Sequence, residues 1–181
     1  FEEGATSWAQ GGGENTTFTF EPVGGNMGGY AIMENNGMGF GVLVANGGSI
    51  IPLAGLGLEE GFAYRFSQDM RLFSGTEMGG LKVELYRGPE LKGEASFTPA
   101  IPAEGGGDWQ TYTFQVDIPL DVDGIKLVPL AGIGSRVGYD NFVVGSEAFP
   151  SPPVLNADFE AGNAFWTEFQ VGTTYAYPEA G

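Results

Sequence analysis

Two segments of the chain alternate polar and apolar side chains, and their polar positions carry the residues best suited to binding chemistry. Residues 62–73 and 81–87 together hold four of the seven basic residues in a protein of formal net charge −16. Polar side chains of this kind can hydrogen-bond sugar hydroxyl groups, and an aromatic ring can cover the C–H face of a sugar. An ordinary solvated sheet face is the alternative interpretation for any single residue. The candidate polar face consists of Arg65, Asp69, Arg71, Lys82, Glu84 and Tyr86, extended by Thr111, Thr113 and Gln115.

Trp109 is a further candidate for sugar binding, because it follows a glycine-rich loop and could lie at the rim of a site. A place in the core is an equally good interpretation, since buried Trp is common in β-sandwiches. Trp8 recurs as Trp166 within a repeated motif, which favours a packing role for that pair.

The composition removes most catalytic arrangements. The sequence contains no His and no Cys, which excludes Ser-His and Cys-His nucleophiles as well as imidazole and thiolate metal sites. Two carboxylates at a suitable separation could hydrolyse a glycoside, but none of the 23 acidic residues stands out as such a pair. No catalytic residue is predicted, and we expect no enzyme activity from this segment itself.

The charge and hydropathy of the chain exclude other partners. A net charge of −16 with only 7 basic residues argues against nucleic acid and against anionic membrane surfaces. No run of about 18 apolar residues is present, so no membrane insertion is predicted. The glycine-rich stretches lack a following helix or Lys, which argues against phosphate binding.

Short alternating segments separated by turn residues predict the elements that position these side chains. Helical periodicity is absent, and segment 93–107, with two prolines and three consecutive glycines, is expected to be a loop. Segment 49–58 fits a covered loop or edge strand. Together the strands predict an all-β protein, an antiparallel β-sandwich. The predicted strands are 16–21, 30–33, 40–45, 62–73, 81–87, 109–118, 124–130 and 137–144.

The opening motif FEEGATSW of residues 1–8 returns as FEAGNAFW at 159–166, which indicates a repeated module. The predicted organisation is one β-sandwich module over 1–145, a proline-rich linker over 146–153, and the opening strands of a second, truncated copy over 154–181. A tail of that length is too short to bury a core alone. We expect it to belong to a second domain that stops partway; the alternative is that it donates strands to a neighbouring copy.

Three segments carry a family resemblance. FEEGATSW resembles the opening of carbohydrate-binding modules with a β-jelly-roll, galactose-binding-like fold, the group that includes families 4, 16 and 22. GFAYRFSQDM at 61–70 is similar to their central strand, and DWQTYTF at 108–114 with RVGYDNFVV at 136–144 is similar to their closing strands. Residues 46–58 and 76–80 match no pattern of these families. The resemblance implies a jelly roll.

The resemblance also implies a structural Ca²⁺. In such modules the acidic residue after the opening Phe and the Asp of the last strand hold the ion, and these positions correspond to Glu2 and Asp140. Segment 24–29 would supply carbonyl oxygens, which suit calcium. The alternative is an exposed Glu2 and an Asp140 that caps a turn; the recurrence of Glu2 as Glu160 favours calcium.

The resulting expectation is non-catalytic polysaccharide binding by a tandem module at the cell surface or outside the cell. The acidic composition suits a secreted protein of a marine or salt-exposed microbe, and the module would be appended to a secreted hydrolase, lyase or adhesive protein. The alternative is a structural or adhesive β-sandwich repeat of a cell-surface fibre, sheath or virion appendage.

Overall fold

The computed structural model describes residues 8–12, 15–26, 28–75, 79–101 and 107–145, together with the backbone of 149–150. The chain divides into two units, Phe1–Phe149 and Pro150–Gly181, and all described side chains belong to the first. The predicted linker and second copy at 146–181 therefore lie outside the described side chains and stay predictions. Within the described ranges, no helix has the length and apolar character needed to cross a membrane.

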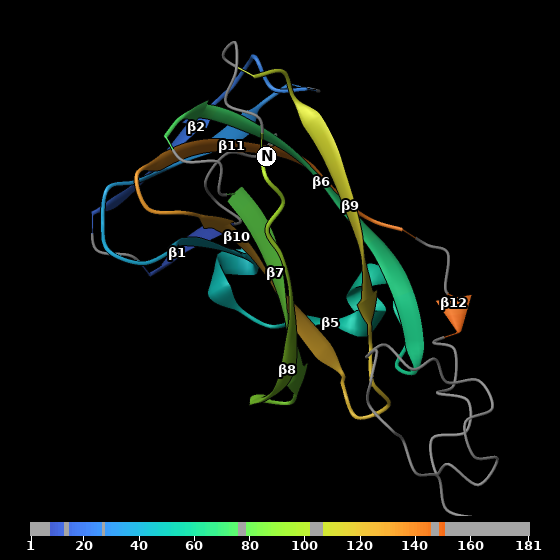
Figure 1. The fold of residues 1–181 in the computed structure, drawn as a ribbon. Coiled ribbons are helices and arrows are strands. Elements are labelled where there is room, and N and C mark those ends of the chain that lie inside the picture. Colours follow the sequence, from blue (N-terminus) through green and yellow to red (C-terminus); the bar gives the residue numbers. More distant parts are fainter. Residues whose placement is uncertain are drawn as a thin grey trace, which may run out of the picture. The chain divides into compact units, whose positions relative to one another are not determined.

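Antiparallel strands form two sheets (Figure 1). Sheet 1 has the order β1-β4-β10-β7-β8, and β5 also pairs with β10. A 3-10 turn, η2 (Asn46–Gly48), follows β4, and a second, η3 (Leu53–Leu56), follows β5. The strands of sheet 1 are β1 (Trp8–Gly12), β4 (Gly41–Ala45), β5 (Ile51–Pro52), β7 (Gly79–Arg87), β8 (Glu90–Phe97) and β10 (Gly124–Ala131).

Sheet 2 arches over sheet 1 in Figure 1 and has the order β2-β3-β11-β6. Strand β9 pairs with β6 on its other side, and the two-residue strand β12 belongs to the same sheet. The predicted antiparallel β-sandwich is confirmed. The strands of sheet 2 are β2 (Thr16–Glu21), β3 (Tyr30–Asn35), β6 (Phe62–Ser74), β9 (Gln110–Asp117), β11 (Ser135–Val144) and β12 (Phe149–Pro150).

The prediction of a loop over 93–107 is wrong in its first part. Strand β8 continues to Phe97 and pairs with β7 as a hairpin, in which Phe97 lies opposite Leu81 and Ala95 opposite Val83. The turn between them uses Gly88 at a φ of 53°, a conformation that glycine adopts without strain. The prolines and glycines that indicated a loop all follow Phe97, so they mark the end of the strand.

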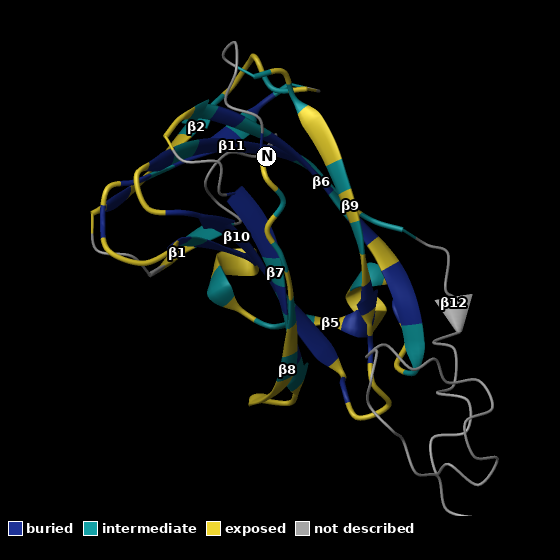
Figure 2. Cartoon of the chain, in the orientation of Figure 1, coloured by how far each residue is buried: buried dark blue, intermediate teal, exposed yellow. Residues whose placement is uncertain are grey.

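Period-two alternation turns one side of each strand towards the interior, and strands of both sheets accordingly carry buried residues (Figure 2). Tyr64 and Phe66 of β6 pack with Leu81, Val83 and Leu85 of β7, and all five are buried. Trp8 packs, partly buried, against the same residues, which confirms its predicted packing role.

Tyr139 links the two sheets through the interior. It is fully buried on β11, and its hydroxyl donates a hydrogen bond to the backbone oxygen of Leu130 on β10. Burial disfavours the phenolate and raises the pKa of Tyr139. The hydroxyl therefore stays protonated as a donor at any physiological pH.

Gln68 interrupts the apolar inner face of β6, between Phe66 and Met70. Its side chain is 1% exposed. Neither its amide nitrogen nor its amide oxygen has a hydrogen-bond partner in the described structure. A buried amide without partners costs stability, because it has given up its hydrogen bonds to water.

Replacing this amide should stabilise the protein. Gln68→Met keeps the side-chain length and removes both unpartnered atoms, so we expect the free energy of unfolding to rise by about 1–2 kcal/mol. Urea denaturation followed by fluorescence measures the change. Gln115→Met, at an exposed position of β9, is the matched control and should change stability by less than about 0.5 kcal/mol. A clear loss of stability in Gln68→Met would mean that the amide is hydrogen-bonded in solution.

Candidate functional site

The predicted polar face is split between the two sheets, so the expectation of one shared face is wrong. Arg65, Asp69 and Arg71 lie on the outer side of β6 in sheet 2, whereas Glu84 and Tyr86 lie on the outer side of β7 in sheet 1. Alternation predicted correctly which side chains turn away from the core. It carries no information on which sheet a strand joins, and the outer faces of a sandwich point in opposite directions.

The outer face of sheet 1 carries a groove with a volume of about 490 Å³. It crosses β1, β4, β10 and β7, so strands distant in sequence build it. Valine side chains and glycine backbone form its apolar part, and one glutamine, one glutamate and two lysines supply its polar groups. The lining residues are Ala9, Gln10, Gly11, Val42, Val44, Gly47, Gly48, Lys82, Glu84, Lys126 and Val128.

Local backbone geometry gives the groove its shape at β1. The register of β1 on β4 shifts between Gln10 and Gly12, which is a β-bulge. A Cβ on Gly11 would lie 2.6 Å from Cγ2 of Val44 and 3.0 Å from Cγ1 of Val42, so a larger residue would collide with these valines. The glycine thus lets the bulged strand pass close to the apolar floor.

Glu84 is the central acceptor of the groove. Its Oε1 lies 2.6 Å from Nζ of Lys82, and its Oε2 accepts a hydrogen bond of 2.7 Å from the hydroxyl of Tyr86. Lys82 also lies 3.6 Å from a carboxylate oxygen of Glu94 on β8. The three side chains of β7 thus form one hydrogen-bonded row along the strand.

The contacts within this row shift the pKa values of Lys82, Glu84 and Tyr86. Burial opposes ionisation of Glu84, but the hydrogen bonds from Lys82 and Tyr86 outweigh it and lower its pKa. Burial likewise opposes the charged form of Lys82, but the hydrogen bond and charge of Glu84 raise its pKa. Burial and the bond to Glu84 together raise the pKa of Tyr86 to about 12. A carboxylate with a lowered pKa is an acceptor and is poorly suited to act as a general acid.

The same shifts set the pH range of the ion pair. The lowered pKa of Glu84 means that its contribution to stability is present above the ordinary carboxyl pKa and is lost as the pH falls through the lowered value. The raised pKa of Lys82 means that its contribution is lost only as the pH rises through that raised value. The row is therefore intact at neutral pH.

Lys126 of β10 lies directly across the strand pair from Glu84. Its ammonium nitrogen is 5.4 Å from the ring centroid of Tyr86, a cation–π contact. One face of the Tyr86 ring is therefore covered by Lys126, which limits its use as a sugar platform.

The outer face of sheet 2 holds a second polar cluster, centred on two adjacent carboxylates. Asp69 of β6 and Asp140 of β11 are register partners, and each is 2% exposed. Oδ2 of Asp69 accepts hydrogen bonds from the side-chain amides of Asn26, at 2.7 Å, and Asn141, at 2.9 Å, while its Oδ1 accepts one from the Thr111 hydroxyl. Asp69, predicted as an exposed sugar ligand, is thus covered.

The loop after β2 folds over this pair. The backbone N–H of Asn26 donates to Oδ2 of Asp140 at 2.7 Å, and that of Asn141 donates to its Oδ1 at 2.8 Å. Gly25 lies so close to Asp140 that a Cβ would collide with the carboxylate and would lie 2.9 Å from the carbonyl oxygen of Gly28. Asp140 therefore positions the loop that passes over it.

This cluster offers some of the ligands that calcium takes. Two carboxylates, two amide side chains and nearby backbone are the hard oxygen donors that suit Ca²⁺. Among the described residues no group of three or more acidic side chains is placed to hold a metal ion, and Glu2 lies outside them. The donor types fit the ion, with Asp140 as the predicted ligand that the structure describes, and calcium remains a prediction.

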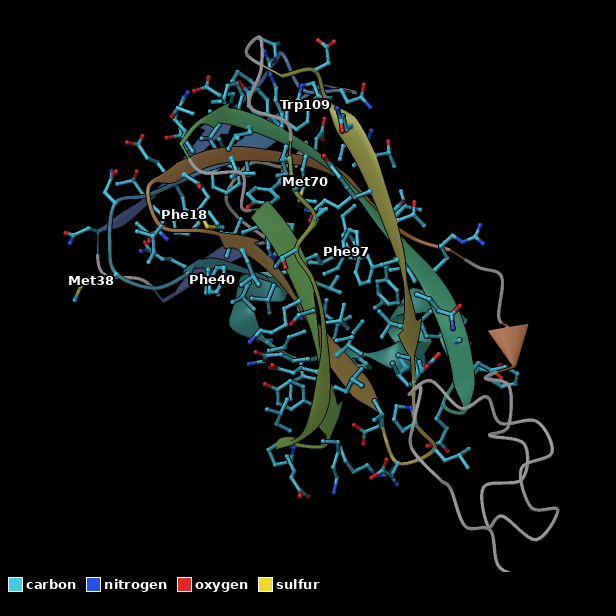
Figure 3. All side chains as sticks on the ribbon, viewed as in Figure 1. Phe18, Met38, Phe40, Met70, Phe97 and Trp109 are labelled. Atoms are coloured by element: carbon cyan, nitrogen blue, oxygen red, sulfur yellow. The ribbon has the colours of Figure 1, made fainter. Side chains whose placement is uncertain are left out.

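Trp109 directly precedes β9 of sheet 2 (Figure 3). Its indole N–H donates to the carbonyl oxygen of Gly24 at 3.1 Å, and its ring meets Tyr30 edge-on, with centroids 5.2 Å apart. Gly138 makes room for it, since a Cβ there would lie 2.9 Å from Cη2 of Trp109 and 2.8 Å from Phe73. Trp109 is half-buried and holds the loop, so its contacts are those of a packing residue.

The arginines of sheet 2 are likewise engaged. The guanidinium carbon atoms of Arg71 and Arg136 lie 4.9 Å and 4.8 Å from the ring centroid of Phe73. Tyr30 stacks on the same ring with centroids 6.0 Å apart. The aromatic surface of this cluster is therefore largely occupied by its own neighbours.

Known proteins match this chain only in structure. A comparison with protein-family models gives no match, and none of the curated proteins matches the sequence. Among solved structures, the CBM22-2 xylan-binding domain of Paenibacillus barcinonensis Xyn10C matches with a TM-score of 0.59 and 14% identity, over 81% of this chain and 96% of that domain. The predicted β-jelly-roll fold of carbohydrate-binding modules is confirmed at the level of the fold.

Two larger structures also match. The CBM22-1 and GH10 modules of Clostridium thermocellum endo-1,4-β-D-xylanase 10B, complexed with xylohexaose, match with a TM-score of 0.63 and 18% identity, over 81% of this chain and 27% of that chain. The enzymatically active domain of bacteriophage CBA120 tailspike protein 4 matches with a TM-score of 0.58 and 14% identity, over 81% of this chain and 20% of that chain. This chain thus spans about a quarter or less of either structure.

Sequence reasoning found Lys82 and Glu84 of the groove, and Tyr86 beside it, but missed most of the lining. Gln10, Lys126 and the three valines come from β1, β4 and β10, and only the strand order brings them to β7. One signal was available: Lys126 is the single charged residue in the otherwise apolar segment GIKLVPLA.

The close approach of the loop to Asp140 predicts a strict need for glycine. Gly25→Ala should lower the free energy of unfolding by about 1–3 kcal/mol, because the methyl group must displace the carboxylate or the backbone of Gly28. Gly55→Ala is the control, since a Cβ there meets nothing within 4 Å, and we expect a change below about 0.5 kcal/mol. Thermal unfolding compares the two. Equal stability of both variants would show that the loop leaves Asp140 in solution.

Proposed function

We propose that this protein is a non-catalytic polysaccharide-binding module and that the groove on sheet 1 is its binding site. The observation that carries the proposal is the groove itself, in which an ionised carboxylate, two ammonium groups and an amide border an apolar floor. The fold supports it, because one structural neighbour is a xylan-binding domain and another was solved with xylohexaose.

The groove side chains suit the chemistry of a sugar chain. Sugar hydroxyl groups would donate to Glu84 and accept from Lys82 and from the amide of Gln10. Val42, the partly buried valine of the floor, would contact an apolar C–H face of the ring, with Val44 and Val128 packed beneath it. Charge-assisted hydrogen bonds are stronger than neutral ones, so the β7 row would contribute most of the orientation.

The same geometry argues against catalysis in the groove. Glycoside hydrolysis needs a second carboxyl group opposite the first, and among the described lining residues Glu84 is the only acid. Its lowered pKa makes it a poor proton donor. The proposal is therefore retention of a polymer rather than cleavage, in a module that is extracellular or at the cell surface, repeated in tandem, and joined to other domains.

Structural calcium at the Asp140 cluster belongs to the same proposal. Asp140 and Glu2 would ligate the ion, with oxygen atoms of the Gly25–Asn26 loop. Bound calcium would fix the loop without contacting the sugar, since the groove lies on the other sheet.

Removing the tyrosine beside the groove tests the binding site. Tyr86→Ala should weaken retention of a bound polysaccharide about tenfold in affinity electrophoresis, because Glu84 loses its hydroxyl donor and Lys126 its ring. Thr113→Ala, exposed on the outer side of β9, is the control for sheet 2 and should leave retention unchanged. Loss of retention in Thr113→Ala alone would move the site to sheet 2. No retention of any polysaccharide by the wild type would favour the structural or adhesive repeat.

Removing calcium with a chelator tests whether the folded protein binds this ion. A ligand that binds only the folded state raises the melting temperature by mass action, so EDTA should lower the Tm by several degrees and added Ca²⁺ should restore it. Asp140→Asn keeps the side-chain size but weakens a calcium ligand, and it should remove most of the EDTA effect. A Tm that is identical with and without EDTA contradicts the calcium proposal.

A further inference from the structure

We propose that the groove selects an anionic polysaccharide, and that Lys126 binds its acidic group. This inference rests on the proposed function and names the ligand class for the same site. The acidic group is a carboxylate of a uronic acid or a sulfate ester, since both are oxyanions that an ammonium group can bind.

The first argument is that Lys126 forms no ion pair, although it lies across the strand pair from Glu84. Among the described side chains, Lys82, Arg87, Lys92 and Arg136 each form an ion pair with Asp or Glu, whereas Lys126 forms none. Its contact is with the Tyr86 ring. Lys126 is half-buried, and an ammonium group held only by a ring can turn towards a ligand without breaking an ion pair.

The second argument is that Glu84, the carboxylate opposite Lys126, has both oxygens engaged. Its Oε1 lies 2.6 Å from Lys82, and its Oε2 accepts a bond of 2.7 Å from Tyr86. Glu84 is therefore neutralised by its own strand. Lys126 adds a further charge, and the groove lining, with two lysines and one glutamate, carries one positive unit in a protein of net charge −16.

The third argument is that the floor of the groove is aliphatic rather than aromatic. A neutral glycan is held chiefly by hydroxyl hydrogen bonds and by stacking on aromatic rings, but the floor consists of Val42, Val44 and Val128. The ring of Tyr86, on the same strand as Lys82 and Glu84, has one face covered by Lys126. With little surface for stacking, a charge-assisted hydrogen bond becomes the strongest single contact that this groove can make.

The negative net charge of the protein does not prevent this binding at physiological salt. The Debye length is about 8 Å at 0.15 M ionic strength, so charges on the remote faces are largely screened while a direct contact is not. Binding measurements therefore belong at about 0.15 M salt or above, where long-range repulsion is weak.

The test compares one polymer with and without its charge. Affinity electrophoresis and calorimetry would use polygalacturonate, the same polymer after reduction of its carboxyl groups, and the pair dextran sulfate and dextran. We expect about tenfold tighter binding of the charged member of one pair. Preference within the first pair assigns a uronate, and preference within the second assigns a sulfate ester.

Variants then place the effect at Lys126. Lys126→Gln should lower the affinity for the charged polymer about tenfold and change that for the neutral polymer less than twofold, whereas Lys126→Arg should retain the preference. Lys92→Gln removes the same charge on β8 outside the groove and should change neither. The melting temperature of each variant shows that it is folded.

The outcomes separate the two proposals. Equal or tighter binding of the neutral polymers overturns the anionic ligand but leaves polysaccharide binding intact. Preference for the charged polymer that survives in Lys126→Gln and is lost in Lys92→Gln overturns the assignment to the groove. Failure to bind any polymer, charged or neutral, overturns the proposed function and this inference together.

Discussion

The juxtaposition of two buried carboxylates, Asp69 and Asp140, constrains much of sheet 2. Like charges on directly opposite residues of neighbouring strands destabilise a sheet, and burial makes the cost larger. The structure meets this constraint with N–H and O–H donors from Asn26, Asn141 and Thr111. Supplying them requires a loop that crosses the sheet face. That loop in turn places Gly24 where its carbonyl accepts from Trp109.

As a consequence, the outer face of sheet 2 is packed and the outer face of sheet 1 carries the groove. On sheet 2, Tyr30, Arg71 and Arg136 pack on Phe73, and the loop is bonded to Trp109. On sheet 1, the glycine at the β1 bulge and the small valine side chains keep a groove open above the strands. This difference is the reason for placing the proposed binding site on sheet 1, even though sheet 2 carries more of the residue types that sequence analysis selects.

Local pattern predicted most of the fold because most strands carry their own sequence signal, although β1 and β8 were not predicted. Thr16–Glu21 forms β2 as predicted, and the alternation of 62–73 and 81–87 gives the buried faces of β6 and β7 correctly. The site depends instead on non-local pairing. Which strands are neighbours, and which face a loop covers, is decided by contacts between residues far apart in sequence, such as Asn26 with Asp140. For this reason Asp69 is covered by a loop whereas Glu84 lines the groove, although both are acidic residues on the outer side of an alternating strand.

The same reasoning explains how a strongly acidic protein can present a cationic groove. Most of its basic residues are neutralised locally: Arg87 lies beside Glu60 and Asp123, and Lys92 beside Glu90 and Asp121, all on exposed surface where such pairs add little stability. Lys82 is neutralised too, but by the carboxylate that lies across the strand from Lys126. With both oxygens of that carboxylate already bonded, Lys126 on the next strand forms no ion pair within the described fold. The excess of positive charge in the groove thus follows from the strand register, and the composition of the whole chain gives no hint of it.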